Sequence, residues 1–167
     1  MPLFNRKSGT SLQGEHELVK DRLGWVLSLL YASDKDGTRE PLKGWTELRL
    51  MLFLVHYKLE NTLYKESPFE FSADAIGPVD QELVETVSQG IDEEMIERAN
   101  KEREDEELYC LTSTGERRAR ELYDSLSDEE RRLLEWVKYS PSHDSPTNLL
   151  ASVYRKHSDM FDSDFSL

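Results

Sequence analysis

The stretch MIERANKEREDEELYCLTSTG, residues 95–115, shows most clearly which fold this sequence predicts. Residues 95–99 and 108–111 are two short candidate strands, and no apolar residue lies between them. Two short strands around a polar tip are typical of a β-hairpin. Directly after the second strand, Ser113 and Glu116 have the spacing of a helix capping box. The stretch therefore predicts a hairpin, or wing, that leads into a helix.

Two helices are predicted well before the hairpin, over residues 15–32 and 46–62. The first shows apolar residues at spacings of four, three and four: Val19, Leu23, Val26 and Leu30. The second is apolar on both sides, which predicts a central helix. After it, Phe69 and Phe71 alternate with polar neighbours and predict a short strand.

A third helix is predicted over residues 78–90, just before the hairpin. Proline is accepted in the first turn of a helix, so Pro78 can open it. Asp80 and Glu82 suit the positive end of the helix dipole. Gly90 is expected to end this helix.

Three more helices are predicted after the hairpin. The second of them opens with a capping box formed by Ser127 and Glu130. Ser145 can cap the last one, with Pro146 at its first position. This order predicts a mainly α fold with a small β wing, namely a winged helix-turn-helix core plus a C-terminal helical extension.

The expected organisation is one domain with two loose ends. Residues 1–14 are expected to form a flexible N-terminal arm, and residues 15–112 the winged-helix core. Residues 113–157 are expected to pack on the same domain as a helical extension. Residues 158–167 are expected to be an acidic, frayed tail.

The charge balance narrows the classes of partner. Lys plus Arg total 21 and Asp plus Glu total 34, which gives a net charge of −13. Such a field repels phosphate and anionic lipid and favours basic partners. The longest apolar run, 50–55, is too short to span a bilayer, and residues 1–10 lack the apolar stretch of a signal peptide. We therefore expect a cytoplasmic protein without membrane contact. The single cysteine, Cys110, is expected to be a small buried side chain.

Four motifs together resemble the YwgA-like winged-helix family. They are GWTELRLMLFL at 44–54, GPVDQEL at 77–83, YCLTSTG at 109–115 and LLASVYRKH at 149–157. The general layout is also similar, more distantly, to the Panacea antitoxin domain, which binds partner proteins. The resemblance implies a fold and a regulatory setting, and it implies no catalytic or ligand-binding residues.

This sequence departs from the family pattern at three positions. Val79 and Asp80 stand where the family has an aromatic residue and a serine, and Trp45 stands where a basic residue is frequent. These changes remove groups able to face a phosphate, which argues against direct DNA binding.

The charge of the predicted DNA-facing elements also argues against a duplex partner. The predicted helix 78–90 has three acidic residues and no basic one, and residues 92–107 have nine acidic and three basic residues. Non-specific affinity for DNA comes mainly from Lys and Arg at phosphates. The alternative reading remains a DNA-binding transcriptional regulator of the winged helix-turn-helix type. In that reading the candidate nucleic-acid contacts are Arg117, Arg118 and Arg120.

No motif for catalysis, metal binding or a cofactor is present in the sequence. The four histidines lie far apart, and none has the spacing of a zinc motif. The glycine of Asp34–Gly37 comes at the wrong position for a calcium loop. We therefore expect a non-enzymatic protein without metal or cofactor.

These observations favour a regulatory or adaptor protein that acts through protein contacts on an acidic surface, with a basic protein partner. A homodimer built on the helical extension is also consistent with the sequence. Trp45 and Trp136 could anchor an interface, but core positions are expected for both because Trp45 continues the apolar side of its helix. The candidate partner surface comprises Asp80, Gln81, Glu82, Glu85, Glu102 and Glu104.

Overall fold

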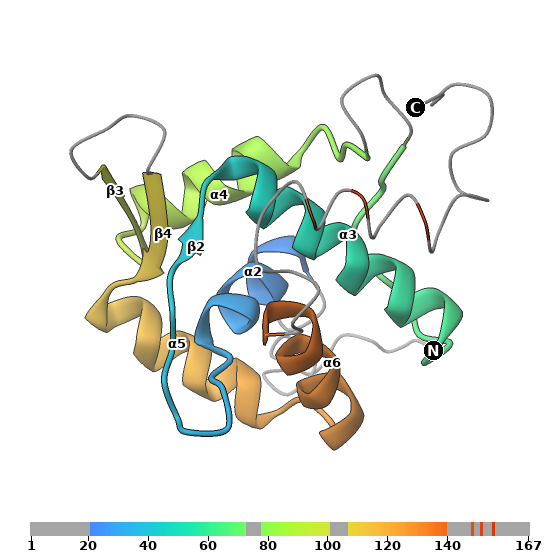
Figure 1. The fold of residues 1–167 in the computed structure, drawn as a ribbon. Helices are drawn as coiled ribbons and strands as arrows, with labels where there is room; N and C mark the ends of the chain where they lie inside the picture. Colours follow the sequence, from blue (N-terminus) through green and yellow to red (C-terminus); the bar gives the residue numbers. More distant parts are fainter. Residues whose placement is uncertain are drawn as a thin grey trace, which may run out of the picture.

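Helices and one small antiparallel sheet make up the parts of the chain that the computed structural model describes, residues 21–72, 78–100 and 107–139, with Asn148, Ala151 and Arg155 as single residues. The elements follow one another as α2 (Arg22–Tyr31), β2 (Leu42–Lys43), α3 (Trp45–Asn61), α4 (Leu83–Asp92), β3 (Ile96–Asn100), β4 (Glu107–Leu111), α5 (Ser113–Asp124) and α6 (Asp128–Tyr139) (Figure 1). The predicted arm 1–14 and the tail 158–167 lie outside the described residues, and so does all of the helix expected from Ser145 except three residues. Those three, Asn148, Ala151 and Arg155, are helical.

The hydrophobic core is built around α2 and α3. Every residue from Gly24 to Leu30 of α2 is buried, and α3 is buried continuously from Glu47 to His56. The prediction of a central second helix is therefore confirmed. Packing of α2 against α4, α5 and α6, and of α3 against α6, joins both ends of the described chain in one core (Figure 1). Each fully buried Leu, Val or Phe contributes about 1.5–3 kcal/mol.

The sheet has the strand order β2-β4-β3, with both pairs antiparallel. The hairpin of β3 and β4 was predicted within one residue at each end, and the structure confirms it. Strand β2 was not predicted, because two residues are too few to show an alternating pattern. It forms because Leu42 is buried opposite Tyr109 of β4. Gly44, with φ of 94°, then turns the chain into α3.

The third predicted helix begins later than expected. Helix α4 starts at Leu83, and Pro78 is not in its first turn. Val79 instead pairs with Ser72 in an isolated antiparallel bridge. The predicted strand at Phe69 and Phe71 is also wrong, since neither residue is in a strand. In both places a long-range contact sets the backbone conformation, and local sequence does not reveal it.

Gly90 does not end α4, which continues to Asp92. A β-carbon at position 90 would lie 2.5 Å from the end of the Ile96 side chain and 3.1 Å from that of Leu23. The glycine is therefore explained by the close packing of α4 against β3 and α2.

The start of α5 rests directly on the backbone at the beginning of the hairpin. Thr112, one residue before the predicted Ser113, is the N-cap and accepts a hydrogen bond from the Gly115 N–H at 3.0 Å. The Thr112 N–H donates to the Met95 carbonyl oxygen at 3.1 Å. A β-carbon at Gly115 would lie 1.9 Å from that same oxygen. In the 109–115 motif, Thr112 is thus explained by its role as the N-cap of α5, and Gly115 by the close approach of the Met95 backbone.

Helix α6 begins and ends with polar contacts. The predicted capping box is confirmed, because the Ser127 N–H donates to the Glu130 carboxylate at 2.9 Å and the Glu130 N–H to the Ser127 hydroxyl at 3.1 Å. Near the other end, the buried Lys138 ammonium donates to the carbonyl oxygens of Leu30 and Ala32, each at 2.8 Å. Burial lowers the pKa of Lys138 to about 7, with a smaller contribution from Arg39. This lysine fastens α6 to the end of α2.

Candidate acidic interaction surface

Exposed carboxylates occur from the turn before α4, along α4 and the turn after it, to the start of β3. Between residues 81 and 97 the chain has six acidic residues and no Lys or Arg. All six are exposed. We call this set the acidic face; its members are Glu82, Glu85, Asp92, Glu93, Glu94 and Glu97.

Few of these carboxylates are neutralised by other parts of the described chain. Glu82 pairs with Arg22 at 3.2 Å, and it is the only member in an ion pair with another described residue. Glu93 accepts a hydrogen bond from the amide of Gln89 at 3.0 Å. A cluster of exposed, unpaired carboxylates generates a negative potential that reaches about 8–10 Å at physiological ionic strength. The acidic face can therefore attract cationic groups.

The structure places the predicted partner-surface residues in three different settings. Gln81, Glu82 and Glu85 are exposed, as a contact surface requires. Asp80 is not: its side chain is 1% exposed, so its prediction as a surface residue is wrong. Glu102 and Glu104 lie outside the described residues.

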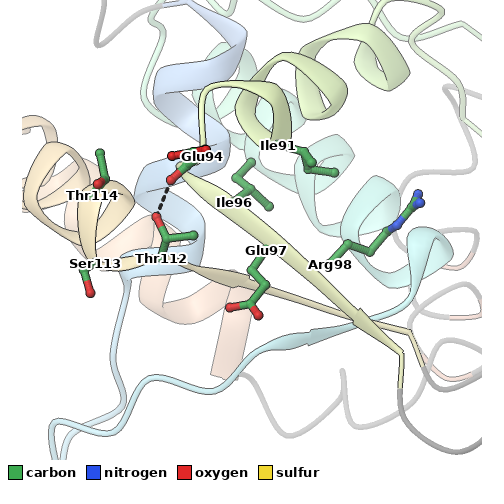
Figure 2. Close-up of a pocket in the computed structure, with 8 residues that line it drawn as sticks. All are labelled: Ile91, Glu94, Ile96, Glu97, Arg98, Thr112, Ser113 and Thr114. Carbon is green, nitrogen blue, oxygen red and sulfur yellow. Dashed lines mark hydrogen bonds between the residues drawn. The ribbon is translucent and has the colours of Figure 1, made fainter.

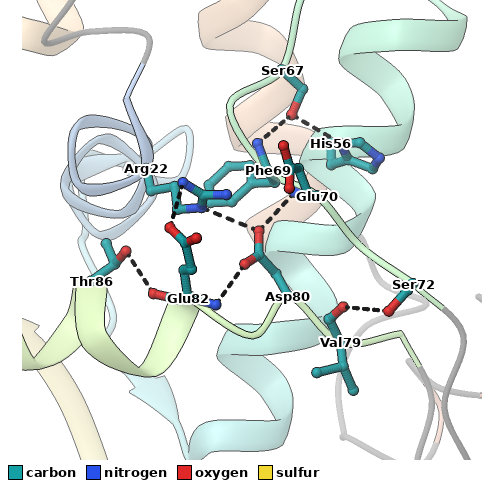
Figure 3. A network of polar contacts seen from close by, with 10 residues as sticks. All are labelled: Arg22, His56, Ser67, Phe69, Glu70, Ser72, Val79, Asp80, Glu82 and Thr86. Carbon is teal, nitrogen blue, oxygen red and sulfur yellow. Dashed lines mark hydrogen bonds and ion pairs between the residues drawn. The ribbon is translucent and has the colours of Figure 1, made fainter.

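Asp80 is buried because it is the centre of a polar network that joins three segments (Figure 3). One carboxylate oxygen accepts from the Arg22 guanidinium at 3.3 Å and from the Glu70 N–H at 2.8 Å. The other accepts from the Glu82 N–H at 2.9 Å. Asp80 thus connects α2, the segment 67–72 and the turn that precedes α4. No sequence pattern indicated these partners, since they lie 10 and 58 positions away.

His56 and Ser67 form a second polar contact beside this network (Figure 3). The His56 Nδ1 lies 2.9 Å from the Ser67 hydroxyl, which also accepts from the Phe69 N–H at 3.2 Å. Burial lowers the pKa of His56, and the carboxylates of Glu60 and Asp80 oppose that shift. The serine hydroxyl therefore holds the backbone of the segment 67–72 in place.

A shallow hollow of about 640 Å³ lies beside the acidic face, where α4, β3 and α5 meet (Figure 2). Its lining comes from the end of α4, from β3 and from the start of α5. The residues are Ile91, Glu94, Ile96, Glu97, Arg98, Thr112, Ser113 and Thr114. The hollow combines apolar side chains, two carboxylates, one guanidinium and three hydroxyl groups, and the sequence did not indicate it.

The three arginines predicted for the alternative, DNA-binding reading do not form one cluster. On α5, Arg118 and Arg120 are separated by about 200° around the helix axis. Arg118 pairs with Glu121 at 3.2 Å, and Arg117 is exposed. Arg120 contacts the Tyr31 hydroxyl, which raises the pKa of its guanidinium. Two of the three are thus engaged in contacts within the chain.

Cys110 and the two tryptophans differ partly from expectation. Cys110 is half-buried, and burial together with the Glu97 carboxylate raises the pKa of its thiol. Trp45 is partly buried and packs against the core. Trp136 is 38% exposed, so the expectation of a core position is wrong for this residue. The Lys58 ammonium lies 5.1 Å from the centre of its ring.

In the part of the chain that the structure describes, no helix has the length and apolar character needed to cross a bilayer. No three or more His, Cys, Asp or Glu side chains in residues 21–72, 78–100 and 107–139 are arranged to hold a metal ion. Comparison with known proteins found no matching family model, no similar curated protein and no similar solved structure. The geometry of the acidic face is therefore the basis for a functional proposal.

Proposed function

We propose that this chain is a non-enzymatic regulatory or adaptor protein that binds a basic protein partner through the acidic face. In the proposal, α2, α3, α4 and the β3–β4 hairpin form a winged helix-turn-helix arrangement, with α5 and α6 as its extension. The observation that carries the proposal is the row of six exposed carboxylates, without a Lys or Arg, between residues 81 and 97.

The position of this charge favours a protein over a duplex. In a winged helix the third helix and the wing normally approach DNA, and here those elements are α4 and the hairpin. Their exposed carboxylates repel phosphates, whereas they attract Lys and Arg side chains and accelerate encounter with a basic surface. The alternative is DNA binding through Arg117, Arg118 and Arg120, and the contacts of Arg118 and Arg120 within the chain weigh against it.

A matched pair of charge variants tests the proposed function. Glu85→Gln, Glu93→Gln and Glu94→Gln together remove three charges from the acidic face. Asp36→Asn, Asp124→Asn and Glu129→Gln remove three exposed charges elsewhere. Proteins retained from an extract of the native host are quantified for the wild type and both variants at low and high salt.

We expect the first variant to lose the retained partner and the second to keep it, with weaker retention at high salt. Titration with duplex DNA at low salt provides the opposite outcome. DNA binding that weakens steeply with salt, and that is lost after Arg117→Gln, Arg118→Gln and Arg120→Gln, would reject the protein-partner proposal.

A further inference from the structure

Strand β3 is an edge of the sheet. It pairs with β4 on one side only, because β2 joins the opposite side of β4. Within the described residues, no other strand pairs with β3. An edge strand presents backbone N–H and C=O groups that can pair with another extended segment.

The register identifies the backbone groups at the open edge. Met95 and Thr112 are opposite one another, and the Thr112 N–H donates to the Met95 carbonyl. In an antiparallel pair, residues that exchange hydrogen bonds alternate with residues that do not. The backbone N–H and C=O groups of Glu97 therefore also bond to β4, whereas those of Ile96 and Arg98 point away from β4.

The side chains beside this edge differ in character on its two sides. Successive side chains of a strand point to opposite faces of the sheet, so Glu97 lies on the face opposite Ile96. Figure 2 shows Ile91 beside Ile96, Glu94 at the start of β3 and Glu97 on the side of the strand opposite Ile91. The hollow is lined by these four residues together with Arg98 and residues 112–114.

We propose that the basic partner docks as an extended segment that adds a strand to the open edge of β3. The added segment bonds to the backbone groups of Ile96 and Arg98. Its alternate side chains are basic, toward Glu94 and Glu97, and apolar, toward Ile91. This inference rests on the proposed function and specifies how the partner binds.

Charge selects the partner for this edge. A second copy of the chain would place another Glu97 and another acidic face beside the first, and each copy has a net charge of −13. Like charges opposite one another destabilise strand pairing. A lysine- or arginine-bearing segment has the complementary charge and is the occupant that this surface favours.

A proline at position 98 tests the strand addition. The Arg98 N–H points outward, so Arg98→Pro removes a donor from the open edge and does not disturb the hydrogen bonds between β3 and β4. Proline is tolerated on edge strands in this orientation. Arg98→Ala is the matched control, because it removes the same side chain and its ion pair with Glu107 but keeps the N–H. The probe is a capped seven-residue peptide of alternating valine and lysine, and the readouts are its Kd and the hydrogen exchange of the Ile96 and Arg98 amides.

We expect the peptide to bind the wild type and Arg98→Ala with similar Kd, and to bind Arg98→Pro about two- to twelvefold more weakly, which is the factor expected from the loss of one backbone hydrogen bond. The Ile96 and Arg98 amides should exchange more slowly in the wild-type complex. Should Arg98→Pro fail to fold, the same peptide N-methylated at its valines is titrated against the wild type and should bind as weakly.

Four results would overturn the inference. The first is equal affinity of Arg98→Pro and Arg98→Ala for the peptide, and the second is unchanged exchange at Ile96 in the saturated complex. The third is no binding of the peptide to the wild type. The fourth is a wild-type dimer that Arg98→Pro dissociates, since the occupant would then be a second copy. If the partner retained from the host still depends on the glutamates of the acidic face, the proposed function stands even when the strand addition fails.

Discussion

The inner and outer sides of residues 78–97 have opposite roles although both are rich in polar groups. On the inner side, Asp80 accepts three hydrogen bonds, and the Met95 carbonyl touches the backbone of α5. On the outer side, the acidic face is exposed and almost without ion pairs. Asp80 and Glu82 are two positions apart, yet one is buried and the other exposed. In an acidic chain, the hydrogen-bond donors near a carboxylate thus determine whether it is buried and stabilises the fold or remains exposed to solvent.

The largest effect on stability is expected on the inner side, from Gly115→Ala. The new β-carbon would lie 1.9 Å from the Met95 carbonyl oxygen, and backbone on both sides cannot give way cheaply. We expect a loss of about 3 kcal/mol or more in the free energy of unfolding, measured by urea denaturation. Gly37→Ala is the control, because its β-carbon meets nothing within 4 Å and only its φ of 82° opposes the change. It should cost about 1–2 kcal/mol; equal losses in the two variants would show that the Met95 contact is not critical.

Asp80→Asn should have the next largest effect. The substitution keeps the size of the side chain but removes the charge that faces Arg22 and replaces one acceptor oxygen by a donor. We expect the free energy of unfolding to fall by about 2–3 kcal/mol, because buried donors lose their acceptor. Glu82→Gln, on the outer side, should change it by less than about 1 kcal/mol, since its ion pair is largely exposed. A similar loss in the free energy of unfolding for both variants would contradict the distinction between the inner and outer sides.

The smallest of the three effects concerns a buried cation, Lys138, which extends the comparison beyond carboxylates. Its folded pKa of about 7 lies below its ordinary value of 10.5, so between these pH values the unfolded chain binds more protons. Stability attributable to this lysine therefore rises with pH across that window and levels off above it. Between pH 7 and 9 the wild type should gain about 2 kcal/mol relative to Lys138→Met. Parallel pH profiles of the two proteins would contradict the lowered pKa.

Local sequence patterns predicted those elements that local interactions determine. The helix over 46–62, the first two helices after the hairpin, the hairpin itself and the Ser127–Glu130 capping box were predicted correctly, because periodicity and caps are visible within a few residues. Strand β2 and the start of α4 were not, since Leu42 pairs with the distant Tyr109, and Asp80, just before α4, is bound by Glu70 and Arg22 from other segments.

The candidate surface was predicted in part for the same reason. Glu82 and Glu85 were correctly predicted to be exposed, because charged side chains normally face solvent, although Glu82 lies just before α4 rather than in it. Asp80 was misplaced, since only the folded chain brings Arg22 to it. The hollow and the open edge of β3 follow from strand order, which the sequence does not specify.

The contact between the Met95 carbonyl and Gly115 has a mechanical consequence. With no side chain between the two backbones, the base of the hairpin and the first turn of α5 have no slack, and neither can shift without displacing the other. Helix α5 packs in turn on α2. A load applied to the hairpin is therefore transmitted as a rigid-body push to the centre of the molecule rather than absorbed where it arrives.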